Sequence, residues 1–130
     1  MANRILPVAL SRRSLMLITS GIPRRKIQVR EDDLLQKNPP EFVEKFDVIR
    51  AANIINRQYF SELALRRMID NLRGRLRPNG ILIICRTHDD NTNNGTIFRR
   101  HGSNLQAVDR IGRGSEVAEL AVQSGSSVEL

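Results

Sequence analysis

Cysteine is almost absent from this chain of 130 residues, since Cys85 is the single one. A lone cysteine excludes an internal disulfide and any zinc site built from several cysteines, so we expect a reducing, cytoplasmic setting. The chain also lacks a run of about 18 consecutive apolar residues, which a membrane-spanning helix would need, and we expect no membrane partner. The composition is that of an ordinary globular domain, with 40% apolar residues and a mean hydropathy of −0.34.

Acidic residues are missing from residues 1–30, which contain seven basic residues. The whole chain has 21 basic and 14 acidic residues, so residues 31–130 carry 14 of each and the net charge of +7 belongs to the first part of the chain. Nucleic-acid binding needs a basic folded surface, and the balanced remainder argues against a nucleic-acid partner for the domain. Residues 1–25 remain open to three interpretations: an ordinary structural segment, a targeting peptide, or a nucleic-acid arm.

Glycine is scarce at the start of the chain, where Gly21 is the only glycine in residues 1–25. The sequence contains neither a phosphate-binding P-loop nor the G-x-S-x-G motif of a nucleophilic serine. We therefore assign no catalytic residue and expect no metal site.

Three apolar patterns predict strands and one predicts a helix. Residues 26–31, "KIQVRE", alternate apolar and polar side chains, while 46–52, "FDVIRAA", and 81–87, "ILIICRT", are short apolar runs. Between the last two, residues 58–77 show one apolar stripe at helical spacing, made of Leu65, Met68, Ile69, Leu72 and Leu76. The charged residues off this stripe are expected to be solvated: Arg66, Arg67, Asp70, Arg73 and Arg75.

The order strand, helix, strand predicts an α/β fold. The continuous apolar run of 81–87 is typical of a strand covered on both faces, so we expect a mostly parallel sheet of the three strands. Two further short strands around the turn "HGSN" predict an antiparallel hairpin near 96–111. "SEVAELAV", residues 115–122, fits either a last helical turn capped by Ser115 or a final strand. We expect a frayed tail over 123–130.

Two polar groups follow predicted strands. Asn53 comes after the small residues Ala51 and Ala52, where a flat ligand could approach the backbone at the carboxyl end of a strand. Taken alone, Asn53 fits a plain strand-to-helix turn better, because asparagine is common in turns. His88, Asp89 and Asp90 follow the 81–87 strand, and we interpret them as a solvated loop rather than a metal site or a general base.

The segments "KIQVREDDLLQ", "FDVIRAANIINRQYF" and "LRPNGILIICRT", followed by a hairpin, resemble the C-terminal half of a class I S-adenosylmethionine-dependent methyltransferase over residues 26–122. Within that superfamily, "FDVIRAANIIN…YF" is most similar to the chemotaxis-receptor methyltransferase group. The resemblance implies a partial Rossmann-like sheet that binds S-adenosylmethionine. It implies that Asp33 accepts a hydrogen bond from the adenine amino group, that Leu34 covers the ring, and that Ala51 and Asn53 lie in the cofactor cleft.

The sequence departs from the family in three places, and one is the turn before 81–87, where Asn79 replaces the first of two glycines. The arginine that often precedes the asparagine is replaced by Ala52, and nothing in residues 1–25 resembles the family's first strand and glycine-rich cofactor loop. We therefore expect a truncated, methyltransferase-like protein acting on a small molecule or a protein side chain. A homo-oligomer or a separate chain could supply the missing half. The alternative is a non-catalytic remnant or interaction module that keeps the half-sheet.

Overall fold

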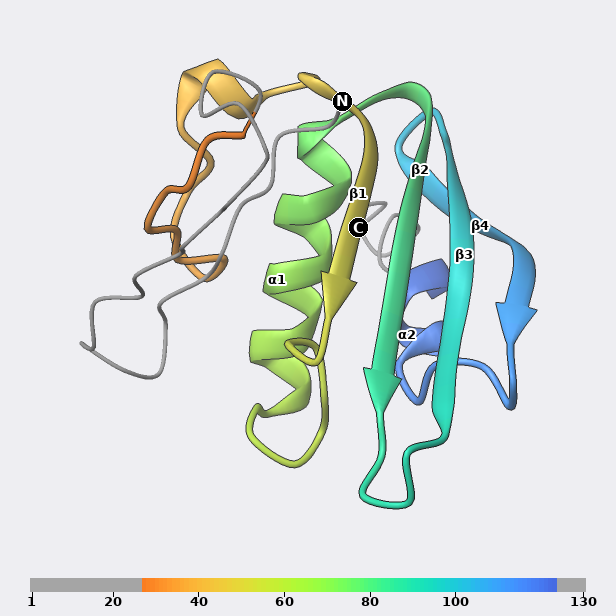
Figure 1. Ribbon diagram of the computed structural model, residues 1–130. Helices are drawn as coiled ribbons and strands as arrows, with labels where there is room; N and C mark the ends of the chain where they lie inside the picture. The colour runs from red at the N-terminus through yellow and green to blue at the C-terminus, as the bar shows by residue number, and fades with distance from the viewer. Residues whose placement is uncertain (1–26, 124–130) are drawn as a thin grey trace.

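The computed structural model describes residues 27–123, which form one mixed sheet with two helices (Figure 1). The elements in chain order are the short 3-10 helix η2 (Pro40–Phe42), β1 (Phe46–Ala52), α1 (Glu62–Arg75), β2 (Leu76–Thr87), β3 (Asn93–His101), β4 (Asn104–Ile111) and α2 (Ala118–Gln123). The strand order is β1-β2-β3-β4. The basic segment 1–25, its run "SLMLITS" and the tail after Gln123 lie outside the described residues.

The predicted α/β class is confirmed, but the expectation of a mostly parallel sheet is wrong. Only β1 and β2 run parallel, whereas β2–β3 and β3–β4 are antiparallel. The physical reason is the short connection over residues 88–92, because so short a loop can only join antiparallel neighbours, whereas a parallel pair needs a crossover of about a dozen residues or more. The hairpin predicted near 96–111 is present and extends over 93–111.

The strand predicted at 26–31 is also wrong within the part that the structure describes. Residues 27–31 have no regular secondary structure, and Val29 is exposed. Alternating apolar residues make a strand only when a neighbouring strand takes up their backbone hydrogen bonds. No strand among residues 27–123 pairs with β1 on the side away from β2. Residues 27–39 instead form a strap that runs to η2, and we use this name below.

Helix α1 follows the predicted apolar stripe but is shorter than 58–77. Ser61 caps its start, with the side-chain oxygen accepting a hydrogen bond from the backbone N–H of Ala64 at 3.2 Å. The helix passes directly into β2 at Leu76. Pro78, Asn79 and Gly80 follow inside the strand as an irregularity, where the pairing with β1 jumps from Phe46↔Leu76 to Val48↔Ile81.

The core lies between one face of the sheet and the two helices. Its members come from α1, α2 and alternate strand positions, and the most buried strand residues are Ala51, Leu82, Ile84, Phe98 and Leu105. Residues 115–122, left open by the sequence, turn into helix α2. The side-chain oxygen of Ser115 accepts a hydrogen bond from the backbone N–H of Val117 at 3.2 Å.

Candidate functional site

The carboxyl ends of β1 and β2 meet at Asn53. Its backbone N–H donates to the carbonyl of Cys85 at 2.9 Å, and its side-chain oxygen accepts from the backbone N–H of Thr87 at 2.8 Å. Its φ is 61°, a left-handed conformation that asparagine tolerates better than most residues. Asn53 therefore ties the ends of two parallel strands together and lies exposed at this edge of the sheet.

The two alanines before Asn53 lie on opposite faces of the sheet. Ala51 is fully buried in the core and pairs with Ile84, while Ala52 pairs with Cys85. The methyl group of Ala51 therefore packs inside the protein, and a ligand at this edge would meet the backbone after it. No bulky side chain of β1 itself extends past the strand end.

The other two predicted cofactor residues lie on the strap. One carboxylate oxygen of Asp33 accepts from the backbone N–H of Leu35 at 2.9 Å, and its carbonyl accepts from that of Gln36 at 3.1 Å, so Asp33 forms a turn with an exposed side chain. Leu34 is only 5% exposed and belongs to the core. Within residues 27–123, no hydrogen bond joins Asp33 to Asn53.

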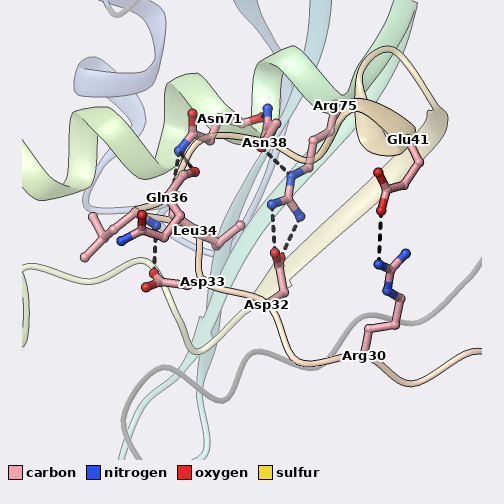
Figure 2. A network of polar contacts seen from close by, with 10 residues as sticks. Arg30, Asp32, Asp33, Leu34, Gln36, Asn38, Glu41, Asn71 and Arg75 are labelled. Atoms are coloured by element: carbon pink, nitrogen blue, oxygen red, sulfur yellow. Dashed lines mark hydrogen bonds and ion pairs between the residues drawn. The ribbon is translucent and has the colours of Figure 1, made fainter.

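The strap is fixed to α1 by a buried polar network (Figure 2). Arg75, in the last turn of α1, is paired through both terminal nitrogens with Asp32 at 2.6 and 2.9 Å. Its third nitrogen donates to the side-chain oxygen of Asn38 at 2.8 Å. The two charged side chains are 2% and 7% exposed, and the guanidinium lies 4.9 Å from the ring centroid of Phe42. The expectation that Arg75 is solvated is wrong, because the carboxylate of Asp32, 43 residues earlier in the chain, compensates its charge inside the protein.

A second anchor of the strap comes from one turn earlier in α1. The side-chain nitrogen of Asn71 donates to the carbonyls of Leu34 at 2.6 Å and Gln36 at 2.9 Å. The backbone carbonyl of Asn71 accepts a hydrogen bond from the side-chain nitrogen of Asn38 at 2.8 Å. Figure 2 shows these bonds beside the Asp32–Arg75 pair, and Asp33 on the side of the strap away from them. The backbone that carries Asp33 is thus held on both sides.

Sequence reasoning also missed Asn56, which is 3% exposed. Its side-chain oxygen accepts from the backbone N–H groups of Gln58 and Tyr59, both at 3.1 Å. The signal that could have revealed it is an asparagine two residues before the start of the predicted helix, because asparagine side chains commonly accept backbone hydrogen bonds in turns.

The polar edge continues into a cluster of charged side chains from three segments. Arg86 of β2 donates to Gln58 at 2.8 Å and forms an ion pair with Glu116 at 3.4 Å. Glu116 also accepts from the backbone N–H of Arg57 at 2.9 Å. These bonds hold the segments before α1 and α2 against the end of β2.

The loop 88–92 forms a shallow, open pocket with the end of the hairpin. Its lining includes His88, Asp89, Asp90, Thr92, Asn93, Asn94, Gly112 and Arg113. The Asp90 carboxylate accepts hydrogen bonds from the Thr92 hydroxyl at 2.6 Å and from the Thr92 backbone N–H at 3.1 Å. Both bonds lower the pKa of the Asp90 carboxyl, and the bond from the hydroxyl has the larger effect. Among residues 27–123 no three His, Cys, Asp or Glu side chains gather as metal ligands would. The loop geometry is that of an internally hydrogen-bonded turn.

No helix in the described part of the chain has the length and apolar character needed to cross a membrane. No protein-family model and no curated protein sequence matches the chain.

Solved structures do match the fold. An S-adenosylmethionine-dependent methyltransferase from Clostridium acetobutylicum ATCC 824 superposes with a TM-score of 0.45 at 14% sequence identity, over 78% of this chain and 55% of that one. The PH0226 protein from Pyrococcus horikoshii OT3 superposes with a TM-score of 0.45 at 16% identity, over 77% of this chain and 51% of that one. The chain thus spans about half the length of each.

Proposed function

We propose that this chain is part of an S-adenosylmethionine-dependent methyltransferase-like domain and supplies the adenine side of the cofactor site. The observation that carries the proposal is Asn53, at the carboxyl end of a parallel strand pair, where ligands bind in open α/β sheets. Its backbone and side-chain oxygen are held by Cys85 and Thr87. The side-chain NH₂ therefore has a fixed direction and remains a donor for a ligand.

The described residues fit one end of the cofactor only. Asp33 uses one carboxylate oxygen for the turn, which leaves the other to accept from the adenine amino group. Leu34 is buried in the core, and the ring-covering role that the resemblance implied for it stays a prediction. The glycines of residues 27–123 lie in helix α1, in strands and around the hairpin, and none forms a loop after β1 that could admit the methionine part.

When bound, S-adenosylmethionine would supply an activated methyl group. Methyl transfer depends mainly on holding donor and acceptor in line, and this chain would contribute by orienting the adenine. We propose that residues outside the described part, or a second polypeptide, hold the methionine end. The motif "FDVIRAANIIN…YF" supports a place near the chemotaxis-receptor methyltransferase group, with a protein side chain or a small molecule as methyl acceptor.

Saturation-transfer NMR with S-adenosylhomocysteine tests this proposal. We expect transfer from the full chain to the adenine protons and little to the homocysteine protons, with a Kd of about 1 mM, equivalent to about −4 kcal/mol. Asp33→Ala should remove most of the transfer, whereas Asp89→Ala, in the loop at the end of β2, should leave it unchanged. Equal transfer to both ends of the ligand, or none to the adenine protons, would contradict the proposal. Low-micromolar affinity in calorimetry would show that the chain alone completes the site.

A second candidate function is an interaction module, in line with the alternative left open by the sequence. The observation in its favour is that both helices pack on one face of the sheet, and no described element packs on the other.

A further inference from the structure

The uncovered face of the sheet consists of the strand residues that alternate with the core. The strand register places Val48 beside Ile81 and Ile83 beside Ile97 on this face, because their neighbours Leu82 and Phe98 are in the core. We call it the outer face. Figure 1 shows α2 behind β2 and β3, and no described element in front of these strands.

The outer face carries apolar side chains that are left partly or largely exposed to solvent. Val48 is 48% exposed and the side chains of Ile81, Ile83 and Ile97 are partly exposed. Ile111, which pairs with Gly95, extends the face to β4 and is 40% exposed. Strands that are apolar on both faces are normally buried on both, and contiguous exposed apolar surface marks a binding site.

Two arginines define the margins of this apolar strip. Arg50 of β1 pairs with Ile83 of β2, and Arg99 of β3 pairs with Ile81 of β2, so the two arginines flank the β2 isoleucines from opposite strands. Both arginines are exposed, and no ion pair within residues 27–123 involves either. On the far side, Asp109 of β4 pairs with Ile97. The centre of the outer face is therefore an apolar strip with an arginine on either side, and the carboxylate of Asp109 borders it beside Ile97.

The charges discriminate between possible covers. Residues 1–26 contain six basic residues and no acidic one, so this part of the chain would bring like charge to Arg50 and Arg99. A second copy would present the same two arginines again.

We propose that the outer face binds a helix of another protein, with an apolar stripe facing Ile81, Ile83 and Ile97 and carboxylates on both margins facing Arg50 and Arg99. An apolar strip takes the side chains that such a helix presents at i, i+3, i+4 and i+7. The arginines supply recognition, since charged groups at an interface margin select partners more than they add affinity. The inference rests on the second candidate function and is independent of cofactor binding.

A displayed library of single 18-residue helices tests the proposal when it is sorted with the labelled full chain. The library randomises an apolar stripe and the positions on both sides of it. We expect the enriched helices to carry Asp or Glu on both margins, and to bind at least 10-fold more tightly than the same peptides with Lys there. Ile83→Ser, which alters only the outer face, should weaken binding at least 10-fold without changing the circular dichroism spectrum.

Reversing the charge of the two arginines tests whether they select the charges on the bound helix. Arg50→Glu with Arg99→Glu should invert the margin preference to Lys and Arg, while the matched pair Arg66→Glu with Arg67→Glu on α1 should not. No enrichment, or a preference that reversal leaves unchanged, would overturn the proposal. A dimer in sedimentation velocity that Ile97→Asp dissociates would overturn it in favour of a second copy. Adenine saturation transfer in the Arg50/Arg99 variant should equal that of the parent, so failure here is distinguishable from failure of the cofactor proposal.

Discussion

Removing one partner of the buried pair Asp32–Arg75 should destabilise the protein strongly, because it leaves the other charge buried without compensation. Both side chains are almost fully buried, and each nitrogen of the guanidinium has an oxygen acceptor at 2.6 to 2.9 Å. Asp32→Leu removes the carboxylate and leaves the guanidinium inside the protein with Asn38 alone. Removing one partner of such a pair costs about 3–5 kcal/mol, because an uncompensated charge stays buried. Domains of this size unfold with about 5–15 kcal/mol, so the loss is a large share of the total.

The assay is a double-mutant cycle followed by urea unfolding. With an m-value of about 1–3 kcal/mol per molar urea, a loss of about 3–5 kcal/mol means that Asp32→Leu and Arg75→Met should each lower the midpoint by about 1–5 M. The double variant should be more stable than either single one, because replacing both charges by apolar groups of similar size is often neutral or stabilising. Single variants that fail to fold while the double variant folds would give the same answer.

A surface pair provides the control. Arg77 and Asp47 are paired at 3.4 Å with side chains 52% and 77% exposed, and Asp47→Ala should change stability by less than about 1 kcal/mol. The reasoning is refuted if the Asp32 and Arg75 substitutions are additive, or if each costs no more than Asp47→Ala.

Three further outcomes follow from the edge of the sheet. Asn53→Asp keeps an acceptor for the Thr87 N–H but loses the side-chain NH₂ donor, so the melting temperature should stay within a few degrees while saturation transfer to the adenine protons falls. Asn53→Leu should lower the free energy of unfolding in urea by about 2–3 kcal/mol, because the hydrogen bond to Thr87 is lost and leucine is strained in the left-handed backbone conformation of this position. Asn56→Ala should lower the free energy of unfolding by about 1–3 kcal/mol, because two part-buried hydrogen bonds from the backbone N–H groups of Gln58 and Tyr59 lose their acceptor; no change would contradict its role. In a carbon-13 titration, the Asp90 carboxyl should ionise below the usual aspartate range, and Thr92→Val should raise the pKa of Asp90. Because the pKa of Asp90 is lower in the folded than in the unfolded protein, the ionised carboxylate stabilises the fold at pH values above the unfolded pKa. This stabilisation is lost as the pH falls through the folded pKa.

Elements with a strong local pattern were predictable from the sequence. The apolar stripe from Leu65 to Leu72 placed α1, and the runs at 46–52 and 81–87 placed β1 and β2, because each pattern matches the period of its own element. The hairpin followed from a short polar turn between two apolar segments. The expectation of a mostly parallel sheet was wrong because residues 26–31 were counted as a third strand, whereas the described sheet is completed by two antiparallel pairs, β2–β3 and β3–β4.

Tertiary contacts account for what the sequence could not predict. Arg75 lies at the margin of the apolar stripe, at helical spacing from Met68 and Leu72, and the sequence could not predict that Asp32, 43 residues away, would compensate its charge in the interior. Residues 26–31 had the alternation of a strand, but strand formation depends on a neighbour, and none is present among the described residues. For Asn53 the sequence allowed a turn role and a ligand role, and the bond to Thr87 supports the first without occupying the donor that the second requires.

The burial pattern of the strap explains how Asp33 acquires a fixed direction. Asp32 points inward to Arg75, and Leu34 points inward to the core, so the backbone between them can present Asp33 only to solvent. Asn71 then fixes the carbonyls of Leu34 and Gln36, which prevents the strap from rotating about its own axis. A carboxylate that had to find its orientation on binding would give up conformational entropy to do so. Here the buried pair and Asn71 have already fixed it, so the same network that stabilises the fold would also lower the entropic cost of any contact that Asp33 makes.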